Sequence, residues 1–324
     1  MTEDKQTNAD LITLNMKNWH GSDLSSFFGR LQYFTSVTAP HKSFYTSASV
    51  KEYNEKVKAV MARADDKGNV TMSRAEAEDF QHQKTILASC MNPDTEEPIM
   101  WAGRVSAFIP TNVPIIAAML MTAPTPTNVI FWQWLNQTYN AGLNYGNRNA
   151  SSKQTTMDLI TAYSIACGVS ISVAMSLRMG ANKALAGKTG FAVAIAGNAI
   201  NYAAVMLSTN ANVFFIRRGE LGTGIAVKDE KSGTEFGNSQ VAAKTAIRNT
   251  MFSRTIYTIP IFFVPALWNM ALTRLRLMPK PKSLLGNVVE VAGVALGLGI
   301  AMPVNCALYP QIGEISVDEL EPQI

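Results

Sequence analysis

The stretch "ITAYSIACGVSISVAMSL", residues 160–177, contains no Asp, Glu, Lys or Arg. A helix rises about 1.5 Å per residue, so about 20 apolar residues span the ~30 Å hydrocarbon core of a bilayer. The Ser, Gly and Ala side chains in this stretch also allow helices to approach closely inside a membrane. The stretch therefore predicts a membrane-spanning helix.

Four more runs without a charged residue lie on both sides of this stretch. They cover residues 105–147, 189–216, 255–273 and 291–313. A charge at the bilayer centre is unfavourable by about 2.5–3.5 kcal/mol on insertion scales, so membrane spans avoid it. Buried core helices of a large soluble domain are the alternative, but such helices usually keep one charged face.

We therefore expect an all-α membrane protein with about five transmembrane helices. The expected spans are residues 105–123, 159–177, 189–209, 255–273 and 284–306. Residues 105–147 are long enough for two crossings, so five and six spans both remain open.

Charged residues are unevenly distributed along the chain. The 324 residues carry a net charge of +4, and only 16% of them are charged, against roughly 25% in a typical soluble domain. Residues 1–104 hold charges of both signs and predict a soluble, mainly helical N-terminal domain. The expected transmembrane domain covers residues 105–309, with a polar loop at 217–249, and residues 310–324 form an acidic C-terminal tail.

Local patterns predict several elements outside the spans. Residues 49–64 place apolar side chains at helical spacing opposite a charged face. Residues 73–90 open with Ser73 and Glu76, which is a capping-box pattern. In the polar loop, "IAVKDEKSGTEFG" predicts a short β-hairpin around a Lys-Ser-Gly turn, and "SQVAAKTAI" predicts the start of a helix.

The sequence argues against an enzyme, a metal site and a nucleic-acid-binding protein. Its basic residues are not clustered, its three Cys (Cys90, Cys167, Cys306) lie far apart, and its three His lack ligand spacing. It contains no P-loop, dinucleotide fingerprint or nucleophile elbow. We expect no catalytic residue, no metal, no cofactor and no nucleic-acid partner. The first residues, "MTEDKQTNAD", resemble neither a secretory signal nor an Arg-rich transit peptide, so addressing to an organelle would use internal signals.

A second informative stretch is "FWQWLNQTYNAGLNYGNR", residues 131–148, which we expect to belong to an amphipathic helix at 129–148. At about 100° per residue its six amides lie within roughly 100° of one another, and Arg148 lies at the edge of that face. The amides are Gln133, Asn136, Gln137, Asn140, Asn144 and Asn147. Larger apolar and aromatic side chains lie on the far side, namely Phe131, Trp132, Trp134, Leu135, Tyr139 and Tyr145.

Three interpretations of this amide face remain open. The amides could hydrogen-bond neighbouring helices, although such bonds average only about 0.6 kcal/mol each in membranes. They could line a polar path or binding pocket, because an amide both donates and accepts without bringing a full charge into the membrane. The helix could also lie at the membrane interface, with Trp132 and Trp134 in the aromatic belt.

Prolines interrupt three of the expected spans. Pro110 and Pro114 flank Asn112 in the first span, Pro260 and Pro265 lie in the fourth, and Pro303 lies in the fifth. A simple kink is one interpretation, and an interrupted helix at a transport site is the other. The candidate substrate-binding residues are Asn112, Asn136, Gln137, Asn140, Asn144, Asn147 and Arg148, and the candidate gating or kink residues are Pro110, Pro114 and Pro303.

Five segments, in the same order along the chain, resemble the sideroflexin family. Residues Asn92, Pro93, Asp94 and Thr95 stand where that family has a His-Pro-Asp-Thr-Gly-Glu motif, and the Asn-rich stretch is the most specific match. The five segments are "FFGRLQYFTSVTAP" (27–40), "NPDTEE" (92–97), the stretch at 131–148, "GELGTGIAVKDEKSG" (219–233) with "GNSQVAAKTAI" (237–247), and "MPVNCALYPQIGEISVDELE" (302–321).

The chain departs from the family pattern at several positions and resembles a divergent member. The family His is Asn92 here, and the family Gly is Glu96. In the first segment a usual His is Tyr33, and a usual Asp-Pro-Arg is Ala39-Pro40-His41.

The resemblance implies a multi-pass secondary transporter of the mitochondrial inner membrane that carries serine, and further small neutral amino acids, to feed one-carbon metabolism. Its partners would be membrane lipids and the amino-acid substrate. A tricarboxylate would need several basic residues within the spans to balance its charge, and the interiors of the expected spans have none. The alternative is a non-transporting scaffold or assembly factor linked to iron or respiratory-complex maturation, acting through residues 1–104 and the 217–249 loop.

Overall fold

The computed structural model describes residues 11–16, 21–147, 155–184, 186–187, 190–229, 232–280, 283–310 and 313–322. Its contacts divide the chain into two compact units. Unit 1 comprises Met1–Pro110 and Gly142–Ser152, and unit 2 comprises Thr111–Ala141 and Lys153–Ile324. The helices α4 and α5 each contribute residues to both units.

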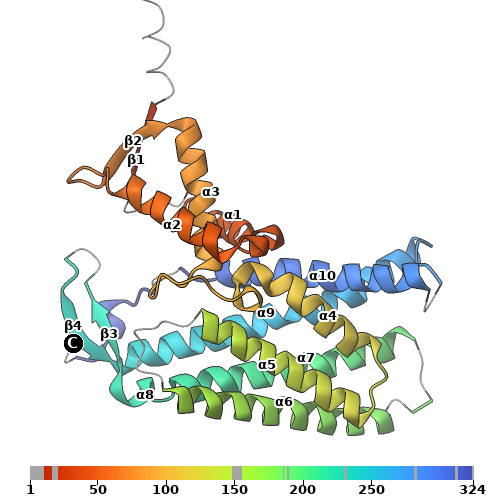
Figure 1. Cartoon of the computed structure of the whole chain (residues 1–324). Coiled ribbons are helices and arrows are strands. Elements are labelled where there is room, and N and C mark those ends of the chain that lie inside the picture. Colours follow the sequence, from red (N-terminus) through yellow and green to blue (C-terminus); the bar gives the residue numbers. More distant parts are fainter. Residues whose placement is uncertain are drawn as a thin grey trace, which may run out of the picture. The chain divides into compact units, whose positions relative to one another are not determined.

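Unit 1 contains three main helices, α1 (Phe27–Val37), α2 (Ser47–Met61) and α3 (Arg74–Cys90) (Figure 1). The helices predicted at 49–64 and 73–90 are thereby confirmed. Ser73 caps α3 as expected, because its Oγ accepts from the Glu76 N–H at 3.2 Å. The Glu76 carboxylate instead accepts from Arg63 Nη2 at 2.6 Å.

The structure contains two short antiparallel sheets, of which the sequence predicts only the one in the polar loop. In unit 1, β1 (Leu11–Asn15) pairs with β2 (Asn69–Ser73). The pair is stabilised by burial of the β2 side chains Val70 and Met72 in a cluster with Phe80. The two strands are far apart in the sequence, and such non-local pairing leaves little trace in local periodicity.

Two buried basic side chains hold the short 3₁₀ helices of unit 1, η1 (Pro40–Phe44), η2 (Trp101–Gly103) and η3 (Val105–Ala107), to each other and to the helices α1 and α3. Arg104 donates to the carbonyls of Ile99 at 2.9 Å and Ser43 at 2.8 Å. Lys42 Nζ donates to the hydroxyls of Ser36 and Thr85, and burial lowers the pKa of Lys42 to about 8. These residues stabilise loops that have few apolar side chains of their own.

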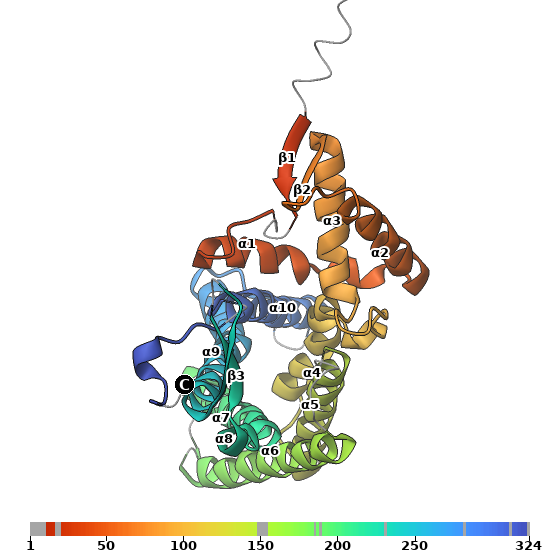
Figure 2. The ribbon, with the colours of Figure 1, turned by 90° about the vertical axis from the view of Figure 1, so that its left-hand side faces the viewer.

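Unit 2 contains four helices that are long and apolar enough to cross a membrane. They are α6 (Thr156–Ala184), α7 (Phe191–Arg217), α9 (Gln240–Arg274) and α10 (Leu284–Ala307). They contain the predicted spans 159–177, 255–273 and 284–306, and α7 covers the predicted span 189–209 from Phe191 onward. The helices α4 (Phe108–Met121) and α5 (Pro126–Gly146) lie next to each other in both ribbon views (Figure 1 and Figure 2).

The residues of the predicted first span, 105–123, form two elements. The first of them form η3, and α4 has 14 residues. The apolar segment Val105–Met121 is shorter than the four long helices and lies at the lower end of the range of about 17–25 residues for a spanning helix, so a crossing by this segment stays a prediction. Pro126 then begins α5, so the helix predicted at 129–148 starts earlier than expected.

The predicted hairpin in the polar loop is confirmed. After the short helix α8 (Glu220–Thr223), β3 (Ile225–Lys228) pairs antiparallel with β4 (Glu235–Ser239). Ser239 Oγ then accepts from the Ala242 N–H and caps α9, which begins at Gln240 as predicted. The remaining element, η4 (Val317–Glu319), lies in the C-terminal tail.

Two glycines allow α10 to approach α9 closely. A Cβ atom at Gly297 would lie 2.6 Å from the Pro260 carbonyl oxygen, and one at Gly293 would lie 2.8 Å from the Trp268 ring. Trp268 Nε1 also donates to the Val289 carbonyl at 3.1 Å. Small residues give membrane helices the close contact that apolar burial cannot supply in lipid.

We expect Gly297→Ala to destabilise the full-length protein in detergent by about 1–3 kcal/mol, because the methyl group overlaps the Pro260 carbonyl. Gly168→Ala in α6 is the matched control, since nothing lies within 4 Å of its added Cβ. The control should be neutral or stabilising by up to about 1 kcal/mol. Equal unfolding free energies for the two variants would contradict the close approach.

The C-terminal tail is attached to the start of α9 by one carboxylate. Glu321 accepts from Ser239 Oγ at 2.6 Å, from Gln240 N at 2.7 Å and from Val241 N at 3.0 Å. The hydrogen bond from Ser239, with the backbone donors beside it, lowers the pKa of Glu321 to about 2. A helix N-terminus favours a negative charge for the same reason.

We expect Glu321→Ala to accelerate hydrogen exchange at the amides of Gln240 and Val241, because both lose their acceptor. Glu314→Ala, at an exposed position of the same tail, is the control and should change neither amide. Because the folded pKa is lowered, the stabilisation is complete above the usual Glu range and is lost as the pH falls toward about 2. Unchanged exchange in Glu321→Ala would disprove the attachment.

Candidate functional site

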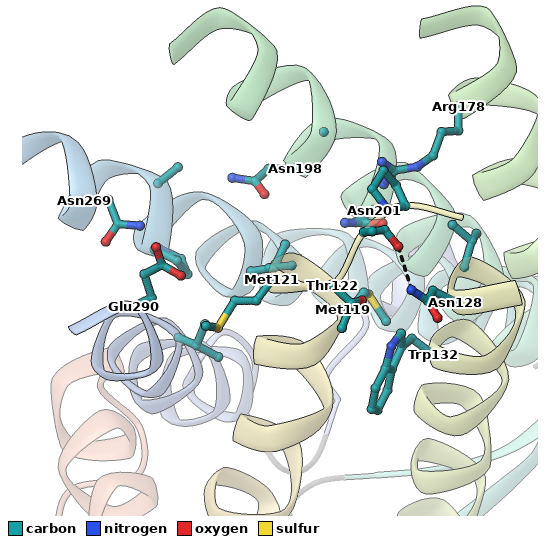
Figure 3. A pocket seen from close by; sticks show the side chains of 18 of the residues that line it. Met119, Met121, Thr122, Asn128, Trp132, Arg178, Asn198, Asn201, Asn269 and Glu290 are labelled. Carbon is teal, nitrogen blue, oxygen red and sulfur yellow. Dashed lines mark hydrogen bonds between the residues drawn. The ribbon is translucent and has the colours of Figure 1, made fainter. Parts of the chain in front are cut away.

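A pocket of about 770 Å³, with both apolar and polar lining residues, lies between the helices of unit 2 (Figure 3). It is lined by the last turns of α4, α6 and α9 and by the first turns of α5, α7 and α10. The connections that follow α4, α6 and α9 therefore share one end of the bundle, as Figure 1 also shows. The lining residues reach about ten positions into α7, which corresponds to about 15 Å of helix.

The polar lining of the pocket is dominated by carboxamides. Charged side chains of both signs accompany them, but the basic Arg178 and the acidic Glu290 lie at opposite ends of the view in Figure 3. The polar lining residues are Thr122, Asn128, Gln133, Arg178, Asn198, Asn201, Asn269, Thr273, Arg274 and Glu290.

The amide face of α5 begins in this pocket. Asn128 and Gln133 line it, and Asn128 Nδ2 donates to the Ala123 carbonyl at 2.8 Å. Gln133 is only 1% exposed and is the lining residue farthest along α5. Its Oε1 accepts from Ser170 Oγ of α6 at 2.6 Å.

Part of the amide face connects α5 to its neighbours. The Ser170–Gln133 bond joins α5 to α6, and Gln137 Nε2 donates to Ser208 Oγ of α7 at 2.8 Å. Both amides and both hydroxyls are buried. These two residues therefore serve helix association, which was one of the three interpretations of the face.

Two other candidate amides have unpaired donors. Asn112 of α4 and Asn136 of α5 are each 2% exposed. The Nδ2 atom of each is buried without an acceptor in the part of the chain that the structure describes. A buried amide without its hydrogen bond is unfavourable by about 1–3 kcal/mol. Both residues therefore can bind a carbonyl or carboxylate oxygen.

The remaining candidate amides lie farther along α5. Asn140 and Asn144 are half-buried. Asn147 Nδ2 donates to the carbonyls of Leu143 at 2.8 Å and Gly103 at 2.7 Å, which ends the helix. Arg148 lies outside the described residues. None of the candidates Asn112, Asn136, Gln137, Asn140, Asn144 and Asn147 lines the pocket itself.

The aromatic residues on the far side of α5 differ in their exposure. Phe131, Trp134 and Tyr145 are exposed, whereas Tyr139 is only 9% exposed. The helix therefore has neighbours on more than its amide face.

The charged residues of the pocket were not among the candidates. In the sequence Arg178 follows an uncharged run, as a basic loop residue does, and Glu290 lies close to the start of the fifth span. The sequence therefore suggests that both are charged residues at the membrane interface. Asn198, Asn201 and Asn269 lie in uncharged runs. Each of these three residues lies toward the helix end that contributes to the pocket, and this position was the available sequence signal for the site.

The candidate prolines lie inside helices. Pro114 is in α4 and the buried Pro303 is in α10. Because proline has no N–H, each frees the carbonyl four residues before it, which for Pro114 is that of Pro110. None of the three lines the pocket.

The Asn92 motif forms a turn within unit 1. Asn92 Oδ1 accepts from the backbone of Asp94 and Thr95, and its Nδ2 donates to the Gly146 carbonyl at 3.2 Å. Pro93 lies within the same turn. Glu96 has a φ of 53°, in the left-handed region where glycine is favoured. The family glycine therefore matches a backbone requirement that Glu96 meets with strain.

Four long apolar helices, with a pocket between their ends that contains polar and charged side chains, define a candidate multi-pass membrane protein with a solute-sized cavity. A family model described as "Sideroflexins" matches residues 13–324. The chain belongs to the sideroflexin family, which consists of transporters and not of enzymes.

Curated relatives agree with this family. The chain is 33% identical to "Sideroflexin" of Dictyostelium discoideum over 302 residues, covering 93% of this chain and 89% of the relative. It is 31% identical to "Sideroflexin-5" of Homo sapiens, covering 93% and 86%. It is 32% identical to "Sideroflexin-3" of Homo sapiens, covering 97% and 92%. No solved structure matches the chain significantly.

We expect a double-mutant cycle of Gln137→Leu and Ser208→Ala, measured by unfolding in detergent, to give a coupling free energy of about 0.6–1.7 kcal/mol. The coupling arises because each single variant removes one partner of the bond between α5 and α7. Thr209→Ala is the control partner, since the Thr209 hydroxyl donates to carbonyls of its own helix. A Gln137–Ser208 coupling no larger than the Gln137–Thr209 coupling would refute the bond.

Proposed function

We propose that this chain is a secondary transporter of small neutral amino acids, serine first among them, in the mitochondrial inner membrane, where it feeds one-carbon metabolism. Sideroflexins are known as mitochondrial amino-acid carriers. The observation that carries the proposal is the pocket of unit 2, whose lining combines five carboxamides with one acidic and two basic side chains (Asn128, Gln133, Asn198, Asn201, Asn269; Glu290; Arg178, Arg274).

The charge of this lining fits a zwitterion better than a tricarboxylate. Two basic side chains, Arg178 and Arg274, and one acidic side chain, Glu290, leave a net charge of +1. A tricarboxylate brings two or three negative charges, which need more cationic partners in a desolvated site. An amino acid brings one charge of each sign, and the pocket offers a partner of opposite sign for each.

The amide face of α5 supplies the route beyond the pocket in this proposal. It continues from Gln133 to Asn136 and on to Asn140 and Asn144, about 17 Å along the helix. The unpaired Nδ2 atoms of Asn112 and Asn136 favour these two residues as substrate contacts. Pro110, Pro114 and Pro303 are proposed to let α4 and α10 bend during transport.

The pocket volume of about 770 Å³ is within the range that holds drug-sized ligands. A small amino acid therefore leaves room for water. Its polar groups remain solvated at the mouth of the pocket and exchange water for protein partners only as the solute moves deeper. This order limits the desolvation that any one step requires.

We expect purified full-length protein in liposomes to take up labelled serine, and unlabelled citrate in tenfold excess to leave that uptake unchanged. Asn136→Leu should lower uptake by about tenfold or more, because it removes a buried amide donor that the solute would use. Asn287→Leu, at an exposed position of α10, is the matched control and should transport normally.

Three outcomes would change the proposal. Uptake of citrate without serine would assign the pocket to another substrate class. Serine uptake unaffected in Asn136→Leu would remove Asn136 from the site. If the wild type moves no amino acid but binds inner-membrane proteins through residues 1–104 and the 217–249 loop, the alternative of a scaffold or assembly factor is correct.

A further inference from the structure

One end of the pocket presents hydrogen-bond acceptors. Trp268 Nε1 of α9 donates to the Val289 carbonyl of α10, which fixes the two helices together one residue before Asn269 and Glu290. Both of these residues line the pocket, and Figure 3 shows them at the same end of it. The Asn269 Oδ1 atom is buried and has no donor among the residues that the structure describes.

The carboxylate at this end has no cationic partner in the described part of the chain. None of the ion pairs found there includes Glu290. Arg274 lines the same pocket but is exposed, and Arg178 lies at the opposite end in Figure 3. Glu290 itself is half-buried in a helix that is apolar enough to cross a membrane.

The ionised carboxylate of Glu290 destabilises this helix when no cation is bound to it. An ionised side chain inside a membrane helix loses hydration, and it is retained where it serves an ion or substrate pathway. The buried Asn269 Oδ1 adds a second oxygen that needs a donor or a cation. Both residues lie at the same end of the pocket, so a positive charge that arrives there stabilises both groups.

We propose that Glu290 and Asn269 form a subsite for a monovalent cationic group. One carboxylate balances one positive charge, and the amide oxygen supplies a further ligand. A calcium ion prefers six to eight oxygen ligands, and no group of three or more His, Cys, Asp or Glu that could hold a metal occurs among the described residues. The subsite deepens the proposed function and rests on it where the cation is part of the transported solute.

Two sources share this chemistry. The primary ammonium of an amino acid has three N–H donors and can bond both oxygens. A sodium ion that drives transport is also bound by oxygen atoms near interrupted helices in secondary transporters, and α9 contains Pro260 and Pro265 just before Asn269. The carboxylate of the same solute would bind elsewhere, with Arg178 as its basic partner.

A binding experiment on the full-length protein in lipid nanodiscs tests the subsite without relying on transport. The melting temperature is followed by intrinsic fluorescence while choline chloride is replaced, at constant ionic strength, by ethanolammonium chloride or by sodium chloride. Choline has no N–H and is too bulky to approach both oxygens. We expect at least one of the two smaller cations to raise the melting temperature of the wild type in a saturable way.

Three variants locate the effect. Glu290→Gln should raise the half-saturating concentration roughly tenfold or more, since a charged hydrogen-bond partner is lost. Glu290→Asp keeps the charge and should retain part of the response. Glu314→Gln, the same substitution on the exposed tail, should behave as the wild type. Equal half-saturation in Glu290→Gln and the wild type, or no cation effect relative to choline, would overturn the subsite.

Uptake in liposomes then separates the two sources. If the substrate ammonium is the ligand, ethanolamine competes with serine in the wild type, Glu290→Gln loses this competition, and choline replaces sodium without effect. If sodium is the ligand, wild-type uptake falls in choline and Glu290→Gln is insensitive to the exchange. An absence of wild-type uptake refutes the proposed transport function, whereas the melting experiment still decides the cation subsite.

Discussion

The hydrocarbon layer contains no water, so each polar group inside it needs a partner from the protein or from a bound solute. Helices satisfy the backbone, and this explains why the long uncharged runs of the chain form α6, α7, α9 and α10. Helix formation does not supply hydrogen-bond partners for polar side chains. The amides of α5 therefore fall into two groups, those bonded to another helix and those that are not.

Gln133 and Gln137 belong to the first group, with Ser170 and Ser208 as their partners. Asn136 belongs to the second, together with Asn112 of α4. A buried amide without a partner destabilises the fold, because an unsatisfied buried donor is unfavourable by more free energy than a typical membrane hydrogen bond contributes. The unbonded members are thus the ones for which we propose a role in binding.

The sequence predicts the elements of this arrangement better than their connections. Uncharged length identifies helices whether or not their partners are known, and the 100° projection of residues 131–148 correctly groups Gln133, Asn136 and Gln137 on a buried face. Periodicity carries no information on which neighbour faces that side. The serines Ser170 and Ser208 therefore become recognisable only once α6 and α7 lie beside α5.

Non-local contacts explain the other differences. The β1–β2 pair joins segments on either side of α2, and the uncharged run that begins at Val105 forms the 3₁₀ helix η3 before α4 starts. Arg178 and Glu290 belong to one pocket because the end of α6 and the start of α10 share one end of the bundle. Each of them, considered alone, is an ordinary charge near a helix end.

Gln133 links the pocket to the rest of the amide face. It is the last pocket residue along α5, and its bond to Ser170 connects it to α6. In the proposed transporter, a solute that passes from the pocket toward Asn136 has to replace this bond with bonds of its own. An interhelical hydrogen bond of this kind contributes only about 0.6 kcal/mol on average, so a solute with one donor and one acceptor can compensate fully for its loss. A solute without hydrogen-bonding groups cannot, and a solute with several like charges is unfavourable before it reaches that point. The absence of water, because of which the amides need hydrogen-bond partners, therefore also makes them select solutes that carry hydrogen-bonding groups and little net charge.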